Sequence, residues 1–159
     1  MKRFLLPLLL AFALPAYSGQ TKYGVEIDPM TDQKKITLML LSEDKVDNSI
    51  GVPKFTALFV RCWGGEPEVF FMTPTYNGNN TRVGLRWDRD QSKYLSWNPS
   101  QAGDGYFSSN PIDTIQTLKG SSSLIFAWTP YQRTMETAKF SLNDLKPLIK
   151  KGKTDGCPY

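Results

Sequence analysis

The chain contains no histidine and only two cysteines. The absence of histidine excludes the Ser-His-Asp and Cys-His arrangements that activate a nucleophile, histidine general bases and HExxH metal sites. Two distant cysteines without histidine also make a poor zinc site, so we expect no metal and no cofactor. Chemistry based on carboxylates alone stays open, and the sequence therefore favours a non-enzymatic protein.

A strong charge excess is absent as well. The 19 Lys and Arg residues stand against 15 Asp and Glu residues, and Lys2 and Arg3 belong to the signal predicted below. The lysines over 146–153 crowd one segment, which we interpret as the solvated face of a helix with favourable charge at its C-terminal end. This small excess of positive charge does not indicate a surface that binds nucleic acid, so we expect no nucleic-acid partner.

Long hydrophobic runs are confined to the N-terminus. A basic start leads into an apolar run over 4–14, and small residues follow at Ala16 and Ser18. This layout predicts a cleaved secretory signal over 1–18, with cleavage after Ala16 as the alternative. The run is short for a membrane span, and no cysteine follows it for lipid attachment. We therefore expect a single domain over 19–159 in the periplasm, with secretion as the alternative and no transmembrane segment after signal removal.

The segment over 57–62 reads A-L-F-V-R-C. On an extended chain Leu58, Val60 and Cys62 point to one face, and the residues between them point to the other. Both faces are largely apolar. The pattern predicts a central strand that is covered on both sides.

Cys62, at the end of this strand, has one possible cysteine partner, Cys157. Two cysteines in an exported chain argue for a disulfide. Closing a loop of about 95 residues would stabilise the fold by about 4–5 kcal/mol in the chain-entropy model. A free pair and a metal-binding pair are the alternatives. If the bond forms, it ties the C-terminal tail to the central strand.

Turn signals at regular intervals separate eight or nine expected strands, and only two segments have helical spacing. Pro111 suits the first position of a helix over 111–118, which Gly120 ends, and a second amphipathic helix is expected over 142–151. We expect a polar loop over 42–53. The pattern predicts an all-β fold with a minor helical part, a single-domain antiparallel β-sandwich with two short helices; a barrel is the alternative. The expected strands cover 23–27, 36–41, 54–63, 68–73, 81–88, 93–98, 106–107, 124–128 and 134–141.

Further landmarks follow one another in a recognisable order. An acidic-proline turn separates the first two strands, the central strand ends in Arg-Cys, and an Arg-x-Asp motif precedes a tryptophan. A proline-led helix, a strand running into Thr-Pro, a phenylalanine-led strand end and a terminal cysteine complete the order. These landmarks lie at 25–27, 28–32, 36–41, 58–62, 68–71, 86–88, 97, 111–118, 126–130, 140–145 and 157.

This order resembles the VasI-type (TagO-like) family of exported accessory proteins associated with type VI secretion. The resemblance covers nearly all of the chain after the predicted signal. The chain departs from the family in its tail around Cys157 and in its aromatic middle, at Trp63, Tyr76 and Tyr94. The resemblance implies an exported, disulfide-bonded, non-enzymatic accessory protein.

A candidate binding face follows from the aromatic and charged residues at the end of the fifth expected strand and in the sixth. Arg86 and Asp88 lie two residues apart, so an Arg–carboxylate pair could anchor a ligand; the favoured alternative is a structural contact that closes the hairpin at 89–90. Trp87 and Trp97 are the better candidates for a groove that binds a sugar or a peptide, with a place in the core as the favoured alternative, and we expect Trp128 in the core. The complete candidate face is Arg86, Trp87, Asp88, Arg89, Tyr94 and Trp97.

Glu66 and Glu68 raise the possibility of a glycosidase, in which paired carboxylates act as acid and base. A solvated turn over 64–67 is the simpler interpretation, and we predict no catalytic residue. The leading hypothesis is therefore an exported accessory protein that binds a protein partner of the cell envelope. The alternatives are an envelope inhibitor or exclusion factor carried by a phage or mobile element, and a carboxylate-dependent glycan hydrolase.

Overall fold

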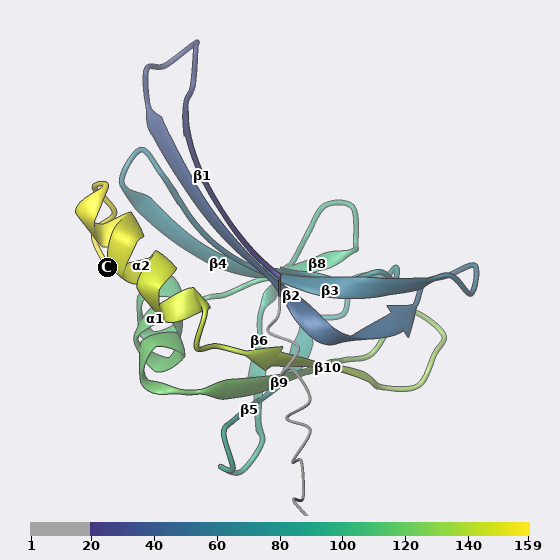
Figure 1. Cartoon of the computed structure of the whole chain (residues 1–159). Coiled ribbons are helices and arrows are strands. Elements are labelled where there is room, and N and C mark those ends of the chain that lie inside the picture. Colours follow the sequence, from purple (N-terminus) through teal and green to yellow (C-terminus); the bar gives the residue numbers. More distant parts are fainter. Residues whose placement is uncertain (1–19) are drawn as a thin grey trace, which may run out of the picture.

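Two antiparallel sheets pack face to face in the computed structural model, which describes residues 20–159. The predicted signal over 1–18 lies outside the described residues. Two helices lie together at one end of the sheets (Figure 1). The predicted fold class, an antiparallel β-sandwich with two short helices, is confirmed.

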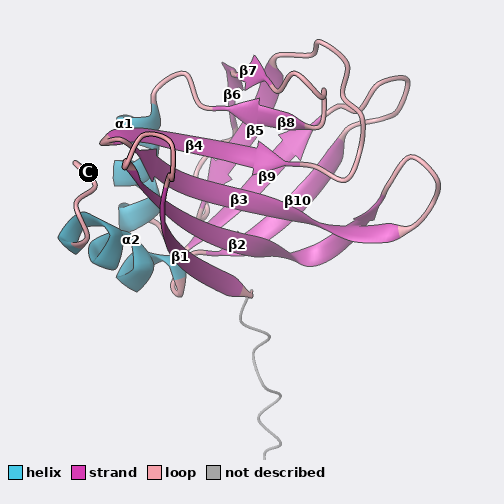
Figure 2. Cartoon of the chain, turned by 90° about the horizontal axis from the view of Figure 1, so that it is seen from above, coloured by secondary structure: helices cyan, strands magenta, loops and turns pink. Residues whose placement is uncertain are grey.

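The first sheet has six strands in the order β1-β2-β3-β4-β8-β7, and the second has four in the order β10-β9-β5-β6. Figure 2 shows the first sheet from above, with the second sheet beneath it. The strands are β1 (Thr21–Ile27), β2 (Lys34–Asp47), β3 (Pro53–Trp63), β4 (Glu66–Met72), β5 (Arg82–Trp87), β6 (Lys93–Ser96), β7 (Asn98–Pro99), β8 (Gly105–Phe107), β9 (Ser123–Trp128) and β10 (Glu136–Ser141). The helices are α1 (Pro111–Gly120) and α2 (Leu145–Thr154).

Alternate side chains of each sheet fill the space between them. Phe71 of β4 stacks on Phe126 of β9, with ring centroids 3.9 Å apart, and also contacts the rings of Trp97 and Phe140. Leu58, Phe71 and Phe126 are fully buried. Each large side chain removed from water in this way stabilises the fold by about 1.5–3 kcal/mol. The aromatic cluster therefore joins the two sheets.

The predicted central strand is confirmed, because β3 pairs with both β2 and β4. The prediction that both of its faces are covered is wrong. One face packs on the second sheet, whereas Phe59 on the other face stacks on Phe70 at 4.8 Å and remains partly exposed. Arg61 lies over the Phe70 ring at 5.0 Å. Neighbouring side chains, not a second layer, shield this face.

The prediction of a loop over 42–53 is wrong in its first half, because β2 continues to Asp47. The pairing of β2 with β3 shifts register between Leu41 and Lys45, which is a β-bulge. At the bulge the Ser42 hydroxyl accepts a hydrogen bond from the Thr56 N–H and donates one to the Asp44 carbonyl. A polar side chain therefore replaces a missing ladder bond, which a sequence pattern of alternating residues does not reveal.

Both helices form where expected, with shifted ends. α1 begins at Pro111, and the Asn110 side chain caps it by accepting a hydrogen bond from the Asp113 N–H. α2 begins three residues later than expected, and its buried residues Leu145 and Ile149 lie four apart on one face. The amphipathic pattern thus located both helices, whereas their ends depend on local capping.

The buried hydroxyl at the bulge yields a test. Ser42→Ala removes the acceptor for the Thr56 N–H, in a position where both residues are buried. We expect the free energy of unfolding to fall by about 1–3 kcal/mol, because a buried donor is left unpaired. The measurement is urea unfolding, with Ser49→Ala at an exposed turn as the control. A loss for Ser42→Ala no larger than that of the control would contradict this account of the bulge.

Candidate functional site

The six residues of the candidate binding face do not share one face. Alternation along β5 places Arg86 on the solvent side of the second sheet and turns Trp87 toward the core. Trp87 and Trp97 are only 9% and 3% exposed, so an open groove lined by both indoles beside Arg86 is excluded. Tyr94 lies on the solvent side with Arg86, and Arg89 is exposed in the turn after β5. Trp128 is buried as expected.

The proposed ligand-anchoring pair of Arg86 and Asp88 does not form among the described residues. Arg86 Nε donates instead to the Asp90 carbonyl at 3.1 Å, which is the turn contact that the alternative predicted. Asp88 follows the end of β5 with a φ of 47° and is no longer a strand residue. Its Oδ1 accepts hydrogen bonds from the backbone N–H groups of Ser122 and Ser123, both at 2.9 Å. Asp88 is therefore a structural residue that holds the start of β9.

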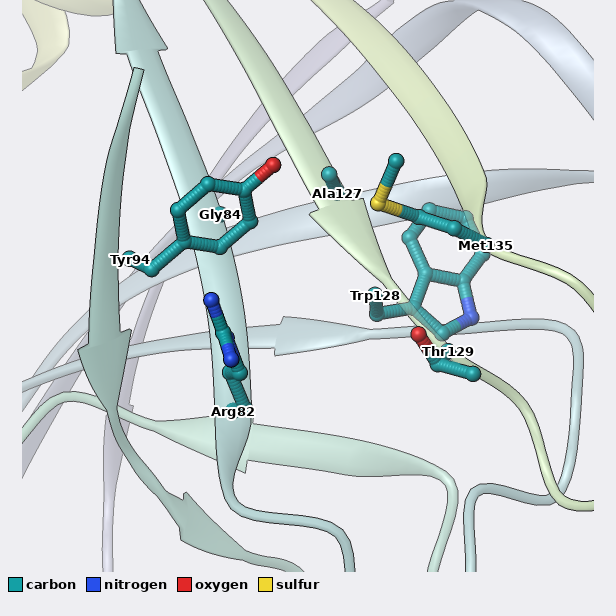
Figure 3. A pocket seen from close by; sticks show the side chains of 7 residues that line it. All are labelled: Arg82, Gly84, Tyr94, Ala127, Trp128, Thr129 and Met135. Carbon is teal, nitrogen blue, oxygen red and sulfur yellow. The ribbon is translucent and has the colours of Figure 1, made fainter.

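A pocket of 350 Å³ lies on the solvent face of the second sheet (Figure 3). Gly84 of β5 pairs directly with Ala127 of β9, and their small side chains leave a depression between Tyr94 and Met135. A Cβ at Gly84 would lie 3.1 Å from the Tyr94 ring and 3.2 Å from the Ala127 Cβ. We name this pocket the outer hollow. It is lined by Arg82, Gly84, Tyr94, Ala127, Trp128, Thr129 and Met135.

Positive charge dominates the outer hollow. The Arg82 guanidinium lies 4.6 Å from the centroid of the Tyr94 ring. A smaller recess of 160 Å³ continues the hollow toward Arg86 and Ile125. Among the described residues neither Arg82 nor Arg86 forms a salt bridge, and no carboxylate lines either recess. The arrangement suits a carboxylate or another planar anion, which guanidinium groups bind through paired hydrogen bonds.

A second pocket of 350 Å³ opens between β6 and α1. We name it the α1 pocket. Its apolar side is formed by Leu85, Trp87, Leu95 and Trp97, and its polar side by Lys93, Ser96, Ser108, Ser109, Asn110, Asp113, Thr114 and Thr117. Several of the polar groups bond to one another; for example, Ser108 Oγ and Thr114 Oγ1 are 2.8 Å apart. The predicted tryptophans thus line a pocket, but only by their edges.

The two glutamates lie on a strand and not in a turn. Glu66 and Glu68 both belong to β4, and the turn before them consists of Gly64 and Gly65 alone. Glu68 Oε2 accepts hydrogen bonds from Arg61 Nε at 2.6 Å and pairs with its Nη2 at 2.5 Å. Glu68 is therefore bound by a guanidinium next to Phe70, and the predicted solvated turn over 64–67 is corrected to a strand end.

Residues 20–159 contain neither a cluster of metal-ligating side chains nor a long apolar helix. No group of three or more His, Cys, Asp or Glu residues there could hold a metal ion. None of the helices in that part is long and apolar enough to span a membrane.

The outer hollow was missed by reasoning from the sequence. Arg82, Gly84 and Arg86 stand two residues apart, so their common face could have been read from the pattern of β5. The partners Ala127 and Met135 could not, because the register between strands is not visible in the sequence.

The fold resembles that of a known protein. The crystal structure of invasion associated protein B from Bartonella henselae superposes with a TM-score of 0.54, at 16% identity, over 89% of this chain and 99% of that chain. No family model and no curated protein matches the chain. At this level of identity the likeness concerns the fold alone, and the resemblance to VasI-type proteins stays a prediction.

The contacts of Asp88 predict a dependence of stability on pH. Hydrogen bonds from the Ser122 and Ser123 N–H groups hold the pKa of Asp88 below its ordinary value. A depressed pKa means that the charged carboxylate stabilises the fold at neutral pH, and that this contribution is lost as the pH falls through the folded-state pKa. We expect Asp88→Asn to lower the stability near pH 7 and to flatten its decline between about pH 5 and about pH 2. Thermal unfolding across this pH range measures both effects. Identical pH profiles for the two proteins would argue against the role of Asp88.

Proposed function

We propose that this protein is an exported, non-enzymatic binding domain that engages a protein partner of the cell envelope through the outer hollow. One observation carries the proposal. Two guanidinium groups, an aromatic ring and a thioether lie together on one face of the second sheet, and neither guanidinium has a carboxylate partner among the described residues. Arg, Tyr and Met are residue types that are enriched in protein interfaces.

The strands that bear the outer hollow support a binding role. Gly84 lies on β5, which is paired on both sides, so the floor of the hollow is fixed before a partner arrives. A preorganised site loses less conformational entropy on binding than a loop does. Tyr94 and Met135 stand 51% and 55% exposed on either side of this floor, and they offer apolar contact area next to the charges.

The cellular setting extends the proposal further. The resemblance to VasI-type proteins makes a component of a type VI secretion apparatus the first partner to test. The fold likeness to a bacterial protein described as invasion associated is compatible with a role outside the cytoplasm, although it names no partner. Genes for a secretion apparatus next to this gene would support that setting, whereas phage genes would favour an exclusion factor.

Cross-linking in living cells tests the proposed interface. A photo-reactive amino acid at Met135 would lie beside the outer hollow, and one at Lys22, on the exposed strand β1, provides the control. We expect Met135 to capture a single envelope protein. Replacing both Arg82 and Arg86 by alanine should reduce the captured amount by about tenfold, because charged groups at the centre of an interface carry much of its affinity. Capture that is equal at Lys22, or unchanged without the two arginines, would reject the outer hollow as the interface.

The cysteines are part of the same proposal, because an exported protein meets oxidising conditions. Cys62 and Cys157 are free thiols in the structure, 2% and 3% exposed. Both cysteines belong to the same core cluster, and burial together with a hydrogen bond with the neighbouring Cys157 raises the pKa of the Cys62 thiol to about 12. The C-terminal tail that carries Cys157 packs against the rest of the fold, because the Cys157 N–H bonds to the Gly152 carbonyl and Tyr159 is buried. We infer that the pair is oxidised to a disulfide in the exported protein.

The inferred disulfide can be checked by mass. Protein purified from the periplasm without reductant and then unfolded should resist alkylation at both cysteines, and its mass should rise by two hydrogens on reduction. Replacing both cysteines by alanine should lower the free energy of unfolding by about 2–5 kcal/mol, since the unfolded chain then loses its cross-link. Pro158→Ala, a change next to Cys157 at an exposed residue, serves as the control. Two alkylated cysteines in the untreated periplasmic protein would disprove the inference.

A further inference from the structure

β6 is an open edge of the second sheet. It pairs with β5 alone, and all four of its residues, Lys93 to Ser96, are exposed. An edge strand presents unpaired backbone N–H and C=O groups that can accept another strand. The α1 pocket opens on one face of this edge, and the outer hollow lies on the other.

The register shows which backbone groups of β6 point outward. The Trp97 N–H bonds to the Thr81 carbonyl at 2.8 Å, and Leu95 lies opposite Val83. Because hydrogen-bonded pairs alternate along an antiparallel ladder, Lys93 and Leu95 direct their backbone groups toward β5, whereas Tyr94 and Ser96 direct theirs away from it. The Ser96 carbonyl accepts a hydrogen bond from Ser109 Oγ at 2.9 Å, which agrees with this orientation.

Three groups therefore remain for an incoming strand: the Tyr94 N–H, the Tyr94 carbonyl and the Ser96 N–H. No hydrogen bond to any of the three is formed within the described residues. A residue of an incoming strand that lies opposite Tyr94 would exchange two hydrogen bonds with it. The three groups therefore have the spacing of the hydrogen bonds in an antiparallel strand pair.

Side chains of such a strand would alternate between the two recesses. Residues opposite Leu95 would point toward the α1 pocket, where Leu95 is 44% exposed and the edges of Trp87 and Trp97 form apolar walls. A residue opposite Tyr94 would lie on the solvent face of the sheet, where the Arg82 guanidinium covers the Tyr94 ring. The two faces thus select different side chains, one apolar and one acidic.

We propose that the β6 edge binds an extended segment of a partner protein as a fifth strand of the second sheet, with alternating acidic and apolar side chains. This inference rests on the proposed function and names the chemistry of the partner. Backbone hydrogen bonds supply affinity in such strand addition, and pockets for alternate side chains supply specificity.

The positive charges near β6 favour an acidic segment over a second copy of the chain as the occupant of this edge. Two β6 edges paired antiparallel about a two-fold axis would place two outer hollows, each with Arg82 and Arg86 beside it, on the same face of one continuous sheet. The described residues supply these arginines with no salt-bridge partner. Like charges placed opposite one another destabilise strand pairing, whereas an acidic segment is attracted.

A synthetic peptide tests the proposal directly. The probe is a fluorescein-labelled peptide of about eight residues in which glutamate and leucine alternate, and its binding is followed by fluorescence anisotropy. Ser96→Pro removes an outward N–H, a change that an edge strand tolerates. We expect Ser96→Pro to weaken binding of the peptide by at least about tenfold.

Two matched controls define the result. Val25→Pro makes the same change on β1, an edge strand of the first sheet: the Leu41 N–H bonds to the Gln20 carbonyl, so alternation turns the Val25 N–H outward. This variant should bind the peptide like the unaltered protein. A peptide with lysine in place of glutamate should not bind.

Amide hydrogen exchange in the unaltered protein gives a second readout that needs no variant. The Tyr94 and Ser96 amides should exchange fast in the free protein and slowly with the peptide, whereas the Leu95 amide should be protected in both states. Absence of added protection at Tyr94 and Ser96 would overturn the proposal, even if Ser96→Pro fails to fold.

The remaining outcomes separate this inference from the proposed function. Equal binding of the peptide by Ser96→Pro and the unaltered protein would reject strand addition. Capture of an envelope protein at Met135 without any peptide binding would reject it too, and would leave the proposed function standing. Dimerisation of the unaltered protein that Ser96→Pro abolishes would assign the edge to a second copy instead.

Discussion

Successive side chains of a strand point to opposite faces, and this constraint governs the whole molecule. In β9 it places Phe126 in the contact with Phe71 and its neighbour Ala127 on the solvent face. In β5 it buries Leu85 and leaves Gly84 beside Ala127. The residues that hold the two sheets together and the residues that shape the outer hollow are therefore adjacent in the chain. Changing the register of one set by a single residue would displace the other.

The place of β6 in the second sheet also determines the proposed binding geometry. Its position at the end of the second sheet leaves three outward backbone groups, on Tyr94 and Ser96, without a partner among the described residues, while β5 holds the opposite row. The cationic outer hollow and the apolar side of the α1 pocket flank the same four residues. A short strand thus stands between two chemically different recesses. This arrangement can distinguish the two sides of an extended chain, which a single pocket cannot do.

Much of the fold could be predicted from the sequence because it depends on local patterns. Alternation in A-L-F-V-R-C located the central strand, and Pro111 located a helix. The continuation of β2 past Leu41 could not be predicted, since it depends on the hydrogen bond from the Thr56 N–H to Ser42 across the bulge. Local patterns describe single strands, whereas bulges depend on their neighbours.

The candidate site was only partly predictable for the same reason. Arg86 and Tyr94 of the candidate face are exposed, whereas Trp87 and Trp97 are buried, as the core alternative for the tryptophans predicted. Their large apolar side chains fit a core and a binding groove equally well, and only the packing of the second sheet decides between them. Met135 and Gly84 are far apart in the chain, and they line one recess because β9 lies between β5 and β10.

Trp97 is the only residue between β6 in the second sheet and β7 in the first, and it is 3% exposed. The chain therefore crosses between the layers through a single residue whose indole contacts Phe71. A connection of one residue provides no loop that could absorb a displacement of β6. A movement of this strand would therefore have to move Trp97, and with it the ring contact to Phe71 in the first sheet.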